Sequence, residues 1–202
     1  MFSGIIEVQS SIIETLTEAN DLQKVVRIFV ERPSAFNDLK IGDSVCVNGV
    51  CLTIEKFDLE KIQFCLGSET LLILGHHFAQ WKKNKLNLER SLKFGDRVHG
   101  HLVTGHVDSL GEIIKSYQDG ECWQIVFKVS ESHKKSFWKK GSVCLNGVSL
   151  TVNDVQDDLI SVCLIPETIQ ATNLAKYLPG EFLTVESDYL AKAYFQFKVN
   201  QS

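Results

Sequence analysis

The chain has 202 residues, of which 44% are hydrophobic and 23% charged, with a formal net charge of −4. This apolar content supplies a packed core and excludes a disordered class, and a pI near 5.9 gives no reason to expect nucleic acid as a partner. Polar side chains interrupt every apolar run, so no membrane span is expected, and the N-terminus has no basic segment of the kind that opens a signal peptide.

Short strand-like segments dominate the chain. They cover residues 25–30, 44–47, 51–54 and 61–66 in the first half, and residues 124–129, 142–145, 149–152 and 159–163 in the second. Asn48-Gly49 and Asn146-Gly147 have the composition of tight hairpin turns between such strands. Many short strands at regular spacing predict an all-β barrel or sandwich.

One segment, residues 187–198, has helical spacing. Its apolar face consists of Leu190, Ala193, Tyr194 and Phe197. Isolated helices of this length are marginal in water, so we expect this face to dock on another surface.

The chain contains a long internal repeat. Residues 48–53 (NGVCLT) recur as residues 146–151 (NGVSLT), about a hundred residues later, and a repeat of this length indicates two copies of a whole domain. The boundary falls near residues 91–96, which gives domains at 1–94 and 95–186 and a helical tail at 187–202. Gly4 then aligns with Gly105, and Ser3 with Thr104. Two copies of a domain predict two pockets, which can hold two molecules of one substrate.

The six cysteines include pairs at the repeat offset, Cys46 with Cys144 and Cys65 with Cys163. Equivalent positions of one fold retain a small apolar side chain, so core packing is expected for Cys46, Cys144 and Cys163. Without a secretory signal, free thiols in a reducing cytoplasm are expected.

Residues 99–108 (HGHLVTGHVD) form the densest polar cluster. Three interpretations are open: a metal site, histidines satisfied within a strand, or a catalytic or ligand-contacting segment. The chain has no Cys-x-x-Cys pair and the second copy adds no matching ligands, so no metal is expected. Gly100 and Gly105 flank His101 and favour the ligand-contacting interpretation, because glycine lets backbone and ligand approach closely.

The repeated tripeptides place small polar groups on one strand face. Cys51 alternates with Thr53, and Ser149 with Thr151. Either the pairs are a solvated strand face or they rim a pocket, and their duplication favours the pocket. Glu69-Thr70 and Glu167-Thr168 resemble helix starts, whose free N–H groups can receive a heterocycle oxygen or a hydroxyl chain.

These motifs together resemble the riboflavin synthase alpha-chain family. The resemblance rests on residues 1–7 (MFSGIIE), the two Asn-Gly-Val motifs, residues 100–108 (GHLVTGHVD) and residues 165–168 (IPET), in order over nearly all of the chain. It implies two homologous six-stranded Greek-key barrels in tandem plus a C-terminal α-helix that helps to build a homotrimer. It also implies no cofactor, no membrane or nucleic acid, and leaves open an association with lumazine synthase.

The activity that the resemblance implies is the last step of riboflavin biosynthesis. Two molecules of 6,7-dimethyl-8-ribityllumazine dismutate: one gives a four-carbon unit to the other, yielding riboflavin and 5-amino-6-ribitylamino-uracil. The site lies between the N-terminal barrel of one subunit and the C-terminal barrel of its neighbour. The acidic 7-methyl group needs a base, for which His106 and His101 are both candidates, and the partner needs a nucleophile from Ser44, Cys51 or water.

The substrate-binding residues implied by the resemblance fall into two sets. The N-barrel set is Gly4, Ile5, Ile6, Cys51, Leu52, Thr53, Cys65, Leu66, Gly67, Ser68, Glu69 and Thr70. The C-barrel set is Gly105, His106, Val107, Lys140, Ser149, Leu150, Thr151, Ile165, Pro166, Glu167, Thr168, Ile169 and Gln170. The hydroxyls of the four threonines at 53, 70, 151 and 168 suit the ribityl chain.

The chain also departs from the family pattern. Cys65 and Asn146 stand where aspartate is frequent, and residues 71–81 replace a threonine-rich segment. Two other classes compete: a non-catalytic lumazine-binding antenna protein, which lacks the histidines of residues 99–108, and a flavin reductase barrel, whose Arg-x-Tyr-Ser/Thr motif is absent here.

Overall fold

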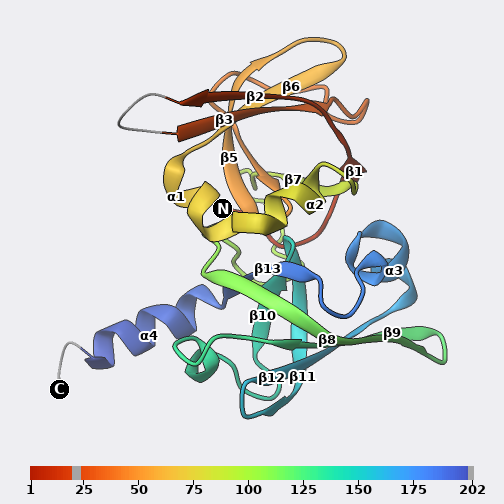
Figure 1. The fold of residues 1–202 in the computed structure, drawn as a ribbon, viewed down its shortest axis with the longest axis vertical. Helices are drawn as coiled ribbons and strands as arrows, with labels where there is room; N and C mark the ends of the chain where they lie inside the picture. Colours follow the sequence, from red (N-terminus) through yellow and green to blue (C-terminus); the bar gives the residue numbers. More distant parts are fainter. Residues whose placement is uncertain (20–23, 200–202) are drawn as a thin grey trace.

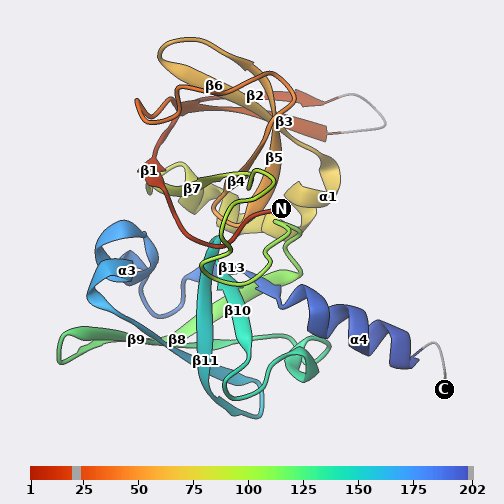
Figure 2. The ribbon, with the colours of Figure 1, turned by 180° about the vertical axis from the view of Figure 1, so that it is seen from behind.

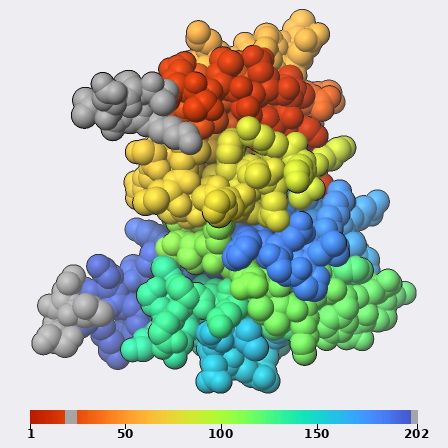
Figure 3. All heavy atoms as spheres, viewed as in Figure 1, coloured from red at the N-terminus to blue at the C-terminus, as the bar shows by residue number. Residues whose placement is uncertain are grey.

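The computed structural model describes residues 1–19 and 24–199. The strands of the first half are β1 (Val8–Ser10), β2 (Ile12–Ala19), β3 (Lys24–Glu31), β4 (Ser44–Val47), β5 (Val50–Phe57), β6 (Lys61–Leu66) and β7 (Leu86–Arg90). Those of the second half are β8 (Ser109–Asp119), β9 (Cys122–Lys128), β10 (Ser142–Leu145), β11 (Val148–Gln156), β12 (Leu159–Leu164) and β13 (Phe182–Ser187). The two halves are stacked on each other, red to yellow above green to blue (Figures 1 and 3).

Both halves have the same strand order. The second half closes into a barrel in the order β10-β11-β12-β9-β8-β13. The first half runs β1-β7-β4-β5-β6-β3-β2, and only Ser11 separates β1 from β2, so both ends of this order belong to one bent stretch of chain. With that stretch counted as one strand, each half is a six-stranded Greek-key arrangement, which confirms the predicted all-β tandem fold.

The Asn-Gly pairs form the predicted hairpin turns. Asn48 and Gly49 have φ of 49° and 90°, and Asn146 and Gly147 have φ of 46° and 85°. Asparagine and glycine tolerate this left-handed region, and two such residues in succession match the twist of the flanking strands. Each turn therefore fixes the start of the strand that carries a predicted polar tripeptide.

Short helices sit beside the strands. They are α1 (Ser68–Leu74), η1 (Gly75–His77), α2 (Phe78–Trp81), η2 (Lys134–Ser136), α3 (Pro166–Ala171), η3 (Leu174–Lys176) and α4 (Tyr189–Val199). Glu69 and Glu167 lie in the first turns of α1 and α3, so both predicted helix starts are confirmed.

The predicted C-terminal helix is present as α4 and projects from the body of the molecule (Figures 1 and 2). It begins two residues later than expected, because Ser187 still belongs to β13 and the Asp188 carboxylate accepts from the backbone N–H groups of Leu190 and Ala191. The rest of the predicted tail, residues 200–202, lies outside the described residues. Along the described chain, no helix combines the length and apolar character that crossing a membrane requires.

Each half has its own apolar core. Phe64 and Trp81 are fully buried in the first, and Phe127 in the second. Two side chains cross between the halves: Val107 packs against the first core and Ile6 against the second. The segments that precede the two barrels are therefore exchanged between them.

Buried asparagines join the barrels. The Asn173 side-chain amide donates to Asn48 Oδ1 at 2.8 Å, and its oxygen accepts from the Asn87 amide at 2.9 Å. The Asn87 amide also donates to the Asn146 backbone oxygen at 3.0 Å. Because these groups satisfy one another away from water, they fix how one barrel sits on the other. Asn146, one of the departures from the family pattern, thus belongs to this network.

Candidate active site

The exchanged segments each lie against the polar tripeptide of the other barrel. The Cys51 N–H donates to the Gly105 oxygen at 2.8 Å, and the Ser149 N–H donates to the Gly4 oxygen at 2.8 Å. The expected assignment of Gly4–Ile6 to the first pocket and Gly105–Val107 to the second is therefore wrong: the two segments lie the other way round. They cross where Phe2 and Val103 pair as an isolated bridge.

Glycine is required where each segment lies on the strand of the other barrel. Gly4 and Gly105 have φ of 74° and 76°. A Cβ on either glycine would lie 2.6 Å from the Cβ of Ser149 or Cys51, closer than packed carbons approach. Each segment therefore lies flush against the strand beneath it.

Two buried carboxylates hold these segments. Glu89 on β7 accepts from the backbone N–H groups of Ser3 and Gly4, and Glu186 on β13 accepts from those of Thr104 and Gly105. Burial raises the pKa of both glutamates. Neither glutamate is among the residues predicted from the sequence, although an acid near the end of the last strand of each copy was a usable signal.

The first barrel carries a pocket of about 390 Å³. Its walls are Val50, Cys51, Glu69, Thr70, Ile73, Leu74, Gly105, His106 and Val107. Cys51 is half-buried and His106 exposed, so a thiol and an imidazole meet at one pocket whose third side is the start of α1. The structure thus joins predicted residues from both copies in a single cavity.

The second barrel carries a different pair. His101 Nδ1 lies 2.6 Å from Ser149 Oγ, and the His101 backbone N–H donates to the same oxygen at 3.2 Å. Burial lowers the pKa of His101, which keeps the ring neutral at pH 7. Its other ring nitrogen is buried without a hydrogen-bond partner. A neutral imidazole on a serine hydroxyl is a base coupled to a proton carrier.

The two barrels differ at equivalent positions. Cys51 occupies the position equivalent to Ser149, and Ile5 the position equivalent to His106. The two barrels therefore share a scaffold and differ in the reactive groups placed on it.

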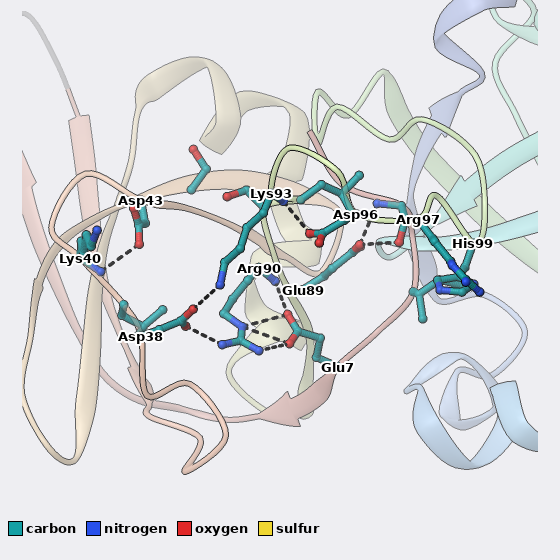
Figure 4. Close-up of a pocket in the computed structure, with 16 residues that line it drawn as sticks. Glu7, Asp38, Lys40, Asp43, Glu89, Arg90, Lys93, Asp96, Arg97 and His99 are labelled. Atoms are coloured by element: carbon teal, nitrogen blue, oxygen red, sulfur yellow. Dashed lines mark hydrogen bonds and ion pairs between the residues drawn. The ribbon is translucent and has the colours of Figure 1, made fainter.

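Ser44 lies apart from both groups. It faces a hollow of about 780 Å³ that also includes Ile5 and His99. Figure 4 shows this hollow crossed by ion pairs, in which Arg90 binds Glu7 at 2.5 Å and Asp38 at 2.6 Å.

The remaining predicted residues divide by exposure. Thr53 and Thr151 are exposed beside Cys51 and Ser149, as the strand alternation predicts. Leu52, Leu66 and Leu150 point into the barrel cores, so only their backbone is left to face a ligand. The others are exposed or half-buried: Cys65, Gly67, Ser68, Lys140, Ile165, Pro166, Thr168, Ile169 and Gln170. Across residues 1–19 and 24–199, no three His, Cys, Asp or Glu side chains gather as a metal site.

Comparison with known proteins supports the duplication. A family model described as the lumazine binding domain matches residues 3–91 and again residues 104–188. The solved structure of LumP complexed with riboflavin superposes with a TM-score of 0.81 at 21% identity, covering 93% of this chain and 99% of that one. The LumP complex with 6,7-dimethyl-8-(1'-D-ribityl) lumazine gives 0.79 at 20% identity, with the same coverage. These likenesses show the shared fold.

Curated relatives match over almost the whole chain. The riboflavin synthase of Chlamydia pneumoniae is 36% identical over 194 residues, covering 95% of this chain and 92% of the relative. That of Photobacterium leiognathi is 35% identical over 192 residues, covering 95% and 86%. That of Bacillus subtilis (strain 168) is 31% identical over 204 residues, covering 100% and 93%.

The fold and the two domain matches define a protein with tandem lumazine-binding domains. Because its relatives share 30% identity or more along nearly their full length, the assignment is narrower than that class. The chain belongs to the riboflavin synthase family.

Proposed function

We propose that this enzyme catalyses the riboflavin synthase reaction, with one 6,7-dimethyl-8-ribityllumazine in each kind of pocket. The observation that carries the proposal is the reciprocal contact in which the leading segment of each barrel lies on the polar tripeptide of the other. One molecule gives a four-carbon unit to the second, and riboflavin and 5-amino-6-ribitylamino-uracil leave.

The two pockets have different roles in this proposal. The neutral His101 ring, with Ser149 on one nitrogen, removes a proton from the 7-methyl group of the lumazine in the second barrel. The carbanion that results attacks the lumazine held in the first barrel. There the Cys51 thiol adds to the ring of that molecule as the nucleophile and is expelled again before the products leave, and His106 at the same pocket relays protons.

The enzyme is proposed to act as a homotrimer. Leu190, Tyr194 and Phe197 are 66%, 57% and 64% exposed on α4, which leaves an apolar face uncovered in the single chain. A second chain covers this face and brings the first barrel of one subunit to the second barrel of its neighbour, so that the two lumazines meet.

Truncation after Asp188 tests the trimer. It removes residues 189–202, and with them the Lys192–Asp108 ion pair, and it keeps β13 intact, including the bonds of Ser187 to Asp108. We expect a folded monomer by light scattering, with most of the turnover lost. A truncated protein that stays trimeric and fully active would contradict the role given to α4.

Two further proposals concern where the enzyme works and which protein it associates with. Six free thiols suit a reducing cytoplasm, where we propose that the enzyme works. We also propose that it associates with lumazine synthase, which co-elution of the two purified proteins would test.

The decisive assay for the activity is direct. The purified protein is mixed with 6,7-dimethyl-8-ribityllumazine, and riboflavin absorbance is followed over time, with the Ser149→Ala variant as the matched control. Steady riboflavin formation that falls sharply in the variant supports the proposal. Tight lumazine binding without turnover would instead favour a non-catalytic binding protein.

A further inference from the structure

We propose that Glu89 and Glu186 are positioning residues that act across the two barrels, each anchored in one barrel and holding the wall of the other barrel's pocket. Only the identity of the bound molecules in this inference rests on the proposed function. The carboxylates, the segments and the strands beneath them are all among the described residues.

Glu186 holds the segment at Thr104 and Gly105 through three hydrogen bonds, which together we call the Glu186 clamp. Its Oε1 accepts from the Thr104 backbone N–H at 2.8 Å and from the Thr104 hydroxyl at 2.7 Å, and its Oε2 accepts from the Gly105 N–H at 2.9 Å. Glu186 belongs to β13 of the second barrel. The segment that it holds lies on Cys51 of the first barrel and forms one side of the 390 Å³ pocket there.

The Glu89 clamp repeats this arrangement in reverse. Its Oε1 accepts from the Ser3 N–H at 2.7 Å and from the Ser3 hydroxyl at 2.9 Å, and its Oε2 accepts from the Gly4 N–H at 2.9 Å. Glu89 belongs to β7 of the first barrel. The segment that it holds lies on Ser149, the hydroxyl that faces His101 in the second barrel.

A carboxylate at these positions is costly for stability. Glu89 and Glu186 are only 3% and 2% exposed, and a buried charge stabilises a fold less than an apolar side chain of similar volume. What the carboxylate offers is two acceptor oxygens for two successive backbone N–H groups. Glutamine has one acceptor and would turn an N–H₂ group toward a backbone N–H, so the clamp would open.

The reactive thiol beneath one segment allows a direct test. We expect Glu186→Gln to raise the rate at which iodoacetamide labels Cys51 by roughly tenfold to a hundredfold, the scale for losing charge-assisted bonds to a buried group. Cys65, on β6 of the same barrel, should keep its rate when labelling is read peptide by peptide by mass spectrometry. Glu89→Gln should leave Cys51 unchanged, although Glu89 lies in the barrel that contains Cys51.

The reciprocal arm uses Ser149→Cys as a labelling probe. In that background, Glu89→Gln should expose residue 149 to iodoacetamide, and Glu186→Gln should not. Thr104→Val keeps the carboxylate and removes the hydroxyl, which donates to Glu186 and accepts from the His106 N–H, so it should raise Cys51 labelling by a smaller factor even if Glu186→Gln folds poorly. Glu181→Gln is the matched control, because the Glu181 carboxylate also accepts a backbone N–H, that of Leu178, outside both pockets.

The outcomes separate this inference from the proposed function, since labelling needs no turnover. Faster labelling of Cys51 alone in Glu186→Gln supports the cross-barrel clamp whether or not riboflavin forms. Equal acceleration at Cys51 and Cys65, an effect of Glu89→Gln on Cys51, or no change at all would overturn it.

Discussion

His101→Ala is the substitution that separates a catalytic histidine from a structural one in the second barrel. If the ring only completes a hydrogen bond to Ser149, its loss costs about 1 kcal/mol, or roughly fivefold in any rate that depends on the bond. If the ring is the base, the loss of general acid–base catalysis costs roughly 10²- to 10⁴-fold. The short 2.6 Å contact and the neutral ring favour the second scale.

Steady-state kinetics with 6,7-dimethyl-8-ribityllumazine distinguish the two. We expect kcat of His101→Ala to fall by at least roughly 10²-fold while KM changes little, because the interaction is made in the transition state. His101→Gln, which keeps a polar group beside Ser149, should restore stability without restoring kcat. A higher KM with kcat preserved, or a loss smaller than tenfold, would refute the assignment of His101 as the base.

The pH profile gives an independent check on the same residue. A base acts in its deprotonated form, and burial lowers the pKa of His101 below its ordinary value of 6.5. The acidic limb of kcat/KM should therefore lie below pH 6.5 in the wild type. The residual activity of His101→Ala should lack that limb, and a limb that persists unchanged belongs to another group.

Three further substitutions follow from the site and the barrel interface. His106→Ala should lower turnover by roughly 10²-fold with little change in riboflavin binding, measured by fluorescence quenching; a rise in KM alone would make His106 a pocket wall. Asn173→Ala should lower the free energy of unfolding in urea by on the order of 3 kcal/mol, because it removes the partner of several buried polar groups. The control Gln156→Ala, at an exposed side chain, should change it by less than about 0.5 kcal/mol. Equal effects of the two substitutions would exclude the asparagine network as a source of stability. Gly105→Ala should abolish activity, because its Cβ would collide with Cys51. Gly42→Ala, at an open turn with positive φ, should add only local backbone strain and keep activity. Comparable losses of activity in the two variants would mean that close approach to Cys51 is not what Gly105 provides.

Local patterns predicted the fold well because the repeat made each weak signal appear twice. The Asn-Gly turns have the positive φ that their composition predicts, and Glu69 and Glu167 begin helices as expected. These features depend on a few neighbouring residues, and sequence spacing reports them directly. The domain limits at 94 and 186 and the functional roles of the site residues stay predictions.

The exchange of the leading segments could not be predicted in the same way. Gly4 and Gly105 occupy equivalent positions, so the repeat says equally well that each serves its own barrel or its neighbour. The choice is made by long-range contacts: Val107 fills the first core and Ile6 the second, and the buried glutamates fix the crossing. The pairing of His101 with Ser149 was missed for the same reason, since it depends on how the segment lies across the second barrel.

The scaffold is the same in both barrels while the side chains on it differ, and the proposed reaction uses that difference. Each barrel receives the segment on its tripeptide from the other barrel, and both keep the same scaffold of turn, tripeptide and buried glutamate. Cys51 and His106 line the pocket of the first barrel, whereas Ser149 lies beside His101 in the second. A dismutation uses one compound in two roles, and a shared scaffold with unlike reactive groups is the arrangement that lets identical molecules bind alike and react differently.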